Sequence, residues 1–387
     1  MKLFRCTCRT APLLYFENVS CGVCGRLTGF SPDTLSLRPY VPAGADLWHD
    51  DEGRAHRLCG NRVRHGVCNW MVPCPDSPHA DAVPGTTANA VPPGGTVPSL
   101  CRACRLNRVI PDLSVNGNLA LWHALEQAKR RCLFTFLELG MPFDDTDART
   151  HPLAFRFMAD GAANPPGTPG AADGGPVTTG HLDGLITINL AEADAIARTR
   201  MQLAMHERYR TLLGHFRHES GHYVWDRLSR TEPAFAAGFR ERFGDERGDY
   251  AAAVAAHYAS GPPPDWATSH ISAYATVHPW EDWAESWAHY LHIIDTLETQ
   301  QSFGIETRMV TAGVSDVKLP FSVGAGESAG HHDFDAIVSL WIDASVMLNG
   351  LNRSMGLPDP YPFVLNGGAI DKLRFVHESV LSAAGVS

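Results

Sequence analysis

The sequence of 387 residues has no uninterrupted apolar run of the roughly 18–20 residues that a membrane helix needs. Its start, MKLFRCTCRT, has no apolar segment of the kind found in signal peptides. Positive charge is also scarce, because 32 Lys and Arg are outnumbered by 42 Asp and Glu, which gives a net charge of −10. These absences argue against a membrane protein, a secreted protein and a protein that coats nucleic acid. We expect a soluble protein of the cytoplasm with no membrane or nucleic-acid partner.

Cysteine is almost absent from the second part of the chain, since nine of the ten cysteines precede residue 105 and only Cys132 follows. Without an export signal, disulfides are not expected, and metal ligation is the better interpretation of the clustered cysteines. The composition, 44% hydrophobic and 19% charged, excludes wholesale disorder. The length predicts two or three domains.

The cysteine spacing predicts two structural zinc sites, each with four thiolate ligands. Two CxxC pairs can each supply two ligands from one tight turn, and each pair has two further cysteines upstream of it. The predicted sets are Cys6, Cys8, Cys21 and Cys24, and Cys59, Cys68, Cys101 and Cys104. Cys74 could replace Cys68, and reduced, buried cysteines are the alternative to metal ligation. Such zinc would fold a module too small to build its own core.

We expect an α+β protein that is mostly helical, with a small cysteine-rich zinc-ribbon module at residues 1–110. A Pro/Gly-rich stretch at 75–99 is predicted to be a flexible insertion in that module. Residues 111–387 are predicted to form a mainly helical domain that contains a strand at 184–190. The helices expected from apolar spacing cover 118–140, about 191–228, 233–260, 280–298 and 334–351.

The most specific signal is His218-Glu219-Ser220-Gly221-His222, an HExxH motif in a segment with helical spacing of apolar residues. Residues four apart project from the same face of a helix, so His218 and His222 can bind one zinc ion. Glu219 would lie beside the metal and act as a general base toward a water molecule.

A catalytic zinc needs a third protein ligand, and the segment at 271–293 offers one. Glu281 follows Pro279 at an expected helix start, 59 residues after His222, and we assign it as the ligand. Glu285, four residues on, would accept an N–H from a ligand histidine and fix its tautomer. The reverse assignment, with Glu285 as the ligand, stays open.

An HExxH motif followed by a helix that opens with E-x-x-A-E resembles the gluzincin metallopeptidases, especially the lethal-factor and MtfA-like branch. In that branch a tyrosine a couple of turns before the third ligand helps to stabilise the oxyanion, and Tyr274 matches its place. Gluzincins bind an extended peptide along the edge of a small sheet. The resemblance therefore implies substrate binding by an edge strand within residues 181–194, through Gly184, Leu185, Ile186 and Thr187, with an ordinary sheet strand as the alternative.

The longer context resembles a bacterial family of zinc-binding metallopeptidases that carry an N-terminal zinc ribbon. The stretches that carry the resemblance are FRCTC, YFENVSCGVCGR, CNW, TGHLDGLITINLAEAD, RTLLGHFRHESGHYVWDRL, ISAYATVHPWEDWAESWAHYLH and NRSMGLPDPYPFVL. The chain departs from this pattern through its Pro/Gly-rich insertions and the additional Cys74.

These observations predict a zinc-dependent peptidase that binds three zinc ions, one catalytic and two structural. Its partners would be a peptide or protein substrate and a protein recruited by the zinc ribbon. The competing hypothesis is an adaptor, in which the ribbon binds a protein or nucleic acid and the helical domain is only a scaffold. Glu219 weighs against the adaptor, because a scaffold needs no general base.

Overall fold

The structure is a computed structural model that describes residues 2–44, 46–74, 100–144, 147–161, 177–204, 211–306 and 334–385. The predicted insertion at 75–99 lies outside these residues. The chain is mixed α/β and divides into two compact units. The first consists of Met1–Asp145, Pro152–Gly180 and Leu185–Arg198, and the second of Thr146–His151, His181–Gly184 and Thr199–Ser387.

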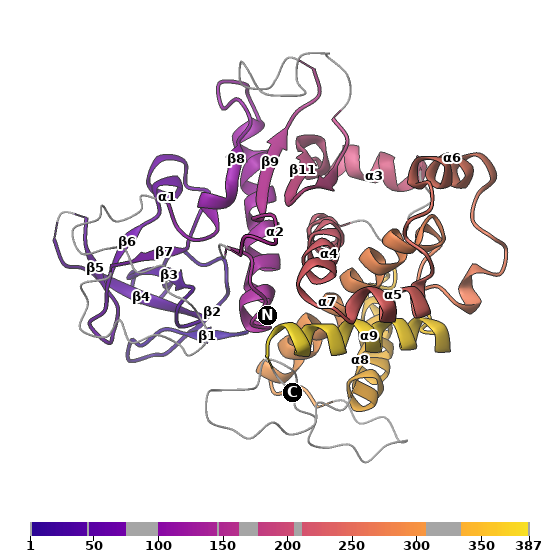
Figure 1. Ribbon diagram of the computed structural model, residues 1–387. Coiled ribbons are helices and arrows are strands. Elements are labelled where there is room, and N and C mark those ends of the chain that lie inside the picture. The colour runs from indigo at the N-terminus through magenta and orange to yellow at the C-terminus, as the bar shows by residue number, and fades with distance from the viewer. Residues whose placement is uncertain are drawn as a thin grey trace. The chain divides into compact units, whose positions relative to one another are not determined.

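An antiparallel five-stranded sheet forms the N-terminal part of the first unit, in the order β3-β4-β5-β6-β7 (Figure 1). Its strands are β3 (Leu27–Ser31), β4 (Ser36–Pro42), β5 (Trp48–His49), β6 (Ala55–Leu58) and β7 (Met71–Pro73). The pair β1 (Phe4–Arg5) and β2 (Leu13–Leu14) and the short helix α1 (Gly60–His65) accompany it.

The long helix α2 (Asn118–Glu138) packs against this cysteine-rich region. The ring of Phe134 lies 5.2 Å from that of Phe16 and 5.6 Å from that of Phe30. Arg130, which is buried, donates a hydrogen bond from Nη1 to the carbonyl oxygen of Val67. These contacts explain why the first compact unit continues past residue 110, where the sequence suggested a boundary.

A second sheet has the strand order β10-β11-β9-β8, with β8 and β11 each parallel to β9. The strands are β8 (Asn107–Val109), β9 (Ala154–Met158), β10 (Gly180–Leu182) and β11 (Leu185–Asn189). The short helices η1 (Cys104–Leu106) and η2 (Leu190–Ala193) precede β8 and follow β11.

The segment expected to supply an edge strand, residues 181–194, contains the end of β10, which lies at the edge of the sheet, and β11, which lies between β9 and β10, so Leu185, Ile186 and Thr187 are not at an edge. Asp183 and Gly184 have φ values of 48° and 79°, as a two-residue hairpin turn requires, and this turn folds β10 back beside β11. Ile186 and Thr187 are buried in the sheet. The predicted substrate binding by Gly184, Leu185, Ile186 and Thr187 stays a prediction, without the free edge on which it was based.

The second unit is mainly helical (Figure 1). Its helices are α4 (Leu212–Thr231), α5 (Phe235–Phe243), α6 (Tyr250–Ser260), α7 (Pro279–Ser302), α8 (Phe334–Ser354) and α9 (Gly367–Ala383), with η3 (Trp266–Thr268) and η4 (Tyr274–Thr276) between α6 and α7. The stretch predicted at 191–228 contains α3 (Ala195–Ala204) and α4, and that at 233–260 is divided between α5 and α6. The sequence interpretation missed α9.

Helices α4 and α7 make the most extensive helix–helix contact in the described part of the second unit, and Gly221 lies within it. A Cβ atom at Gly221 would come within 3.0 Å of both the Ala284 Cα and Trp287 Cδ1. The indole N–H of Trp283 donates to the carbonyl oxygen of Gly221 at 2.9 Å, and that of Trp287 donates to Ser220 Oγ at 3.1 Å. The lack of a side chain thus lets the HExxH helix approach α7 closely.

Among the described helices, α8 alone is long and apolar enough to cross a membrane, by length and composition only. It has 21 residues and a mean hydropathy of 1.3, and 33% of the apolar window is buried. Its buried residues include Ile337 and Trp341, and it packs against α7 and α9. The absence of a membrane partner stays a prediction.

Candidate metal centres

Helix α4 presents both histidines of the HExxH motif. It begins after Thr211, whose Oγ1 accepts a hydrogen bond from the Gly214 N–H at 2.9 Å and so caps the helix. His218 and His222 follow one turn apart, with their rings 4.9 Å from each other. This arrangement directs both imidazoles to one side of α4.

Helix α7 supplies the third candidate ligand from its first turn. His278 is the N-cap residue and accepts a hydrogen bond from the Trp280 N–H at 3.2 Å, and Pro279 occupies the first helical position. Glu281 lies two residues after Pro279, in the first turn of α7, and is only 1% exposed. A carboxylate is electrostatically favoured at a helix N-terminus, which helps to offset the cost of burying it.

The three side chains converge on one point. Glu281 Oε2 lies 3.0 Å from His218 Nε2 and 3.5 Å from His222 Nε2, and one ligand atom from each residue lies within 4.8 Å of the other two. Glu281 Oε2 is buried without a hydrogen-bond partner among the described residues. Two imidazoles and a carboxylate are a donor set that suits zinc and leaves a coordination position open. The residues therefore fit a catalytic zinc ion.

Glu285 lies on the far side of the His218 ring rather than at the point of convergence. Its Oε1 is 2.8 Å from His218 Nδ1, and its Oε2 accepts a hydrogen bond from Ser272 Oγ at 2.6 Å. The geometry thus separates the two carboxylates between which the sequence left a choice. A proton on Nδ1 that is shared with Glu285 would leave the Nε2 lone pair of His218 free for a metal.

The charge balance of the cluster favours a cation. Burial would lower the pKa of His218, but the nearby carboxylates of Glu281 and Glu285 outweigh burial and raise it well above its ordinary value. Burial would likewise raise the pKa of Glu281, but His222 and His218 hold it well below its usual range. The two carboxylates therefore remain ionised and stabilise a positive charge beside the imidazoles.

Tyr250 is a site residue that the sequence interpretation missed. Its hydroxyl donates a hydrogen bond to Glu281 Oε1 at 2.7 Å. Tyr250 lies 31 residues before Glu281, on the exposed, alanine-rich helix α6. The sequence held no signal for it, because no motif or spacing joins Tyr250 to the histidines.

Tyr274 and Glu219, predicted to act on the substrate and on water, both lie beside the metal ligands. The ring of Tyr274, at the start of η4, is 6.0 Å from that of His218. Burial and the nearby Glu281 raise the pKa of Tyr274 above its ordinary value, so the phenol stays protonated. Glu219 is 8% exposed, and its Oε2 is buried without a hydrogen-bond partner among the described residues.

The first cysteine cluster is built from the segment after β1, which carries Cys6 and Cys8, and the turn before β3, which carries Cys21 and Cys24. Its four sulfur atoms lie within 4.8 Å of one another. The Cys24 N–H donates to Cys21 Sγ at 3.5 Å, and Gly25 has a φ of 72°, so the CxxC segment forms the tight turn that its sequence suggested. The backbone and side chain of Arg26 lower the pKa of Cys24 to about 6. This favours a thiolate, the form that binds zinc.

The second cluster brings together the sulfur atoms of Cys59, Cys68, Cys101 and Cys104, also within 4.8 Å. All four cysteines are buried, and the N–H groups of Trp70 and Cys101 donate to Cys68 Sγ and Cys59 Sγ at 3.4 Å each. Cys68, not Cys74, is the member of this cluster. Both clusters fit a closed, four-thiolate zinc site.

A cation on α2 lies close to the second cluster. Burial would lower the pKa of Arg130, but Cys68 and Glu126 outweigh burial and hold it above its ordinary value. Arg130 Nη1 is 3.6 Å from Glu126 Oε2, which lies 4.0 Å from Cys104 Sγ. A positive charge at this place offsets part of the negative charge that four thiolates would bring to a zinc ion.

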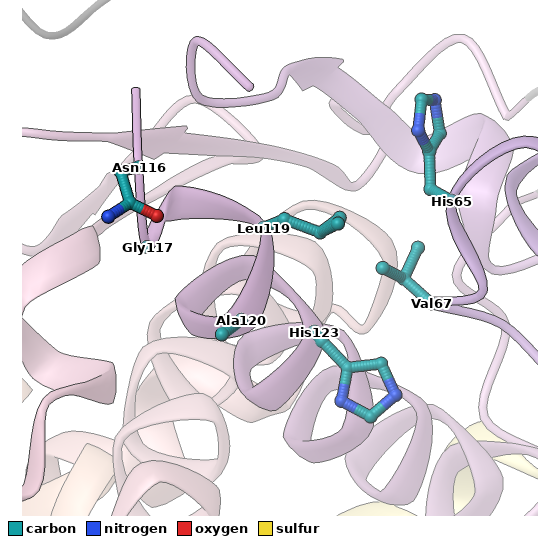
Figure 2. A pocket seen from close by; sticks show the side chains of 7 residues that line it. All are labelled: His65, Val67, Asn116, Gly117, Leu119, Ala120 and His123. Atoms are coloured by element: carbon teal, nitrogen blue, oxygen red, sulfur yellow. The ribbon is translucent and has the colours of Figure 1, made fainter. Parts of the chain in front are cut away.

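Surface pockets also lie outside the three clusters. One of about 460 Å³ opens at the start of α2 (Figure 2), and its lining residues are His65, Val67, Asn116, Gly117, Leu119, Ala120 and His123. Another, of about 280 Å³, lies between α6 and the residues after Tyr274 and is lined by residues that include Ala253, His257 and Val277. The sequence predicted neither pocket.

Two family matches and several related proteins cover most of the chain. Residues 118–379 match the family described as putative zinc-binding metallo-peptidase, and residues 3–115 match a zinc-ribbon domain. Uncharacterized proteins of Mycobacterium tuberculosis and Mycobacterium bovis are 37% identical over 369 residues, which cover 95% of this chain and 92% of theirs. No solved structure matches the chain. The chain belongs to the putative zinc-binding metallo-peptidase family and carries the zinc ribbon at its N-terminus.

Proposed function

We propose that this protein is a zinc-dependent peptidase of the gluzincin type. His218, His222 and Glu281 would hold the zinc ion. The observation that carries the proposal is the convergence of two histidine Nε2 atoms on Glu281 Oε2, a buried oxygen with no hydrogen-bond partner among the described residues. A zinc ion bound there would lower the pKa of a water molecule and polarise the carbonyl of the scissile peptide bond.

The side chains around the ligands supply the remaining functions. Glu219 takes the proton of the attacking water and passes it to the leaving amine, and its buried Oε2 supports this role because no hydrogen bond from a described residue occupies it. Tyr274 donates a hydrogen bond to the oxyanion from its place beside His218. Glu285 orients His218 through Nδ1.

The zinc ribbon has a structural role in this proposal. Two thiolate clusters, each with four ligands, leave no open position for a substrate, so their zinc ions stabilise the fold. Exposed apolar side chains near the first cluster, Tyr15, Val19 and Val23, make this face suitable for recruiting a protein substrate or partner.

The zinc content of the full chain tests the metal sites without a known substrate. The three clusters predict about three zinc ions per wild-type chain and about two in a His218→Ala/His222→Ala variant, as elemental analysis would measure. An unchanged zinc content would contradict the histidine site and favour the adaptor hypothesis.

A Glu219→Gln variant tests the chemistry. The amide keeps the size of the side chain but cannot accept the proton, so we expect hydrolysis of a fluorogenic peptide library to fall about 10²–10⁴-fold with three zinc ions retained. Glu241→Gln, at an exposed glutamate on α5, is the matched control and should leave hydrolysis unchanged. Full activity in Glu219→Gln would refute the mechanism.

A further inference from the structure

We propose that Tyr250 is a positioning residue for the third zinc ligand. Its hydroxyl holds Oε1 of Glu281, so that Oε2 alone faces His218 and His222. The inference rests on the proposed zinc site, but it concerns how the carboxylate is oriented rather than which peptide is cleaved.

The two oxygens of Glu281 have different surroundings. Oε1 accepts the Tyr250 hydrogen bond at 2.7 Å, whereas Oε2 has no hydrogen-bond partner among the described residues and lies 3.0 Å and 3.5 Å from the two Nε2 atoms. A carboxylate can bind zinc through one oxygen or through both. A donor on Oε1 favours the first mode, because it competes with the metal for the lone pairs of that oxygen and restricts rotation of the carboxylate.

The position of Tyr250 is itself well determined. Asp249 caps α6 by accepting a hydrogen bond from the Ala252 N–H at 3.0 Å, which sets Tyr250 as the first helical residue. The Tyr250 ring packs edge-on against His278 and Trp280, with centroid distances of 5.4 Å and 5.7 Å. Both neighbours belong to the N-terminus of α7, so the phenol is held against the same turn that carries Glu281.

The rest of α6 gives no other reason for this contact. None of its residues is buried. If Tyr250 served only to attach α6, packing of its ring would suffice, and its hydroxyl would not need to reach a carboxylate that is 1% exposed. A hydrogen bond from outside the ligand set that orients a ligand is typical of metal sites, and its loss typically lowers metal affinity by about 10–100-fold.

A Tyr250→Phe variant of the full chain isolates the hydroxyl, because the ring and its packing remain. We expect the affinity of the histidine site for zinc to fall about 10–100-fold, so that a correspondingly lower chelator concentration removes this zinc ion than in the wild type. The zinc ions of the two thiolate clusters should be retained. Zinc per chain after equilibration with a graded series of chelator concentrations measures this. Cobalt substituted at the histidine site should also change its visible absorption, which reports ligand geometry directly.

Tyr290→Phe is the matched control, since it removes a tyrosine hydroxyl from a different hydrogen bond, 3.0 Å to His377 Nδ1, away from the candidate metal ligands. It should lower thermal stability and leave zinc affinity and the cobalt spectrum unchanged. Wild-type zinc affinity and cobalt spectrum in Tyr250→Phe would overturn the inference while leaving the zinc site intact. Failure of the proposed function would instead appear as wild-type zinc content in the His218→Ala/His222→Ala variant.

Discussion

The cysteine clusters of the first unit draw their ligands from turns, whereas the histidine cluster draws its ligands from the sides of two packed helices. In the ribbon, backbone N–H groups donate to the sulfur atoms, and the side chains of Arg26 and Glu126 lie beside the two clusters. In the helical unit, Glu285 contacts His218 through Nδ1, and Tyr250 donates a hydrogen bond to Glu281, each on the side of the candidate ligand that faces away from the point of convergence. Four-ligand turns suit an ion that stabilises a fold, and a three-ligand site with ordered supporting groups suits an ion that must bind a substrate.

The difference also concerns what holds each region together. The α4–α7 contact is made by buried tryptophans and a close glycine approach, which need no metal. The five-stranded sheet consists of strands of two to seven residues, and the eight clustered cysteines all lie outside its strands. We therefore expect that the ribbon needs zinc in order to fold. The helical unit should fold without zinc and need it only for its activity.

The largest effect should come from removing a ribbon ligand. Cys101→Ser replaces a thiolate in the buried second cluster and should cost about 3 kcal/mol or more of unfolding free energy, because metal binding there is coupled to folding. His218→Ala should remove about one zinc ion with a smaller loss of stability. Calorimetry together with zinc analysis measures both effects.

Cys132→Ala provides the control for this prediction, since Cys132 is also buried but belongs to neither cluster. Its zinc content should match the wild type. A Cys101→Ser protein with wild-type zinc and melting temperature would abolish the proposed distinction between the two regions.

A second prediction tests whether helix packing alone builds the histidine site. Gly221→Val should destabilise the helical unit by about 1–3 kcal/mol, because its side chain meets the backbone of Ala284 and the ring of Trp287. The displaced helices should also bind zinc more weakly at the histidines. Denaturant unfolding and zinc analysis of the full chain would measure the two effects.

Gly350→Val is the matched substitution for Gly221→Val. It also lies within a helix, α8, but a Cβ atom there has no neighbour within 4 Å. Its stability should stay within about 0.5 kcal/mol of the wild type, as is usual for surface positions. Equal effects of the two valines on stability would contradict the inference that the close approach of α4 to α7 requires glycine at position 221.

The sequence predicted local features better than features that depend on tertiary contacts. The HExxH helix, the helix start at Pro279 and the CxxC turns are encoded within a few residues each, and all of them are present. The neighbours of β11 were not predictable in this way. They depend on the Asp183-Gly184 turn, which places β10 at the edge of the sheet.

Tyr250 shows the same limit within the site. Its hydrogen bond to Glu281 joins residues 31 positions apart and on different helices. The role of Gly221 was equally hidden, because only the structure shows that Trp287 lies against it. Sequence spacing identifies side chains that lie on the same helix or turn, such as His218 and His222. It does not identify the residues on other helices that contact them.

The smallest effect concerns a buried histidine that lies outside the three candidate metal clusters. Burial lowers the pKa of His289 to about 4, and its Nδ1 lies 2.8 Å from the Tyr361 hydroxyl. Above pH 6.5 this histidine is neutral in both the folded and unfolded states, so it adds no pH dependence. As the pH falls from 6.5 toward 4, the unfolded chain takes up a proton that the folded chain does not, and stability decreases.

His289→Leu removes this titration while keeping an apolar side chain against Tyr361. Between pH 7 and pH 5 the wild type should lose about 1–2 kcal/mol more unfolding free energy than the variant. Urea unfolding at the two pH values gives this difference. The unfolding free energy that the variant itself loses between pH 7 and pH 5 measures the contribution of zinc release and of the other histidines, and it is subtracted from the loss in the wild type. Parallel pH profiles would mean that His289 takes up its proton as easily in the folded unit as in the unfolded chain, and acid sensitivity would then have to originate at the metal ligands.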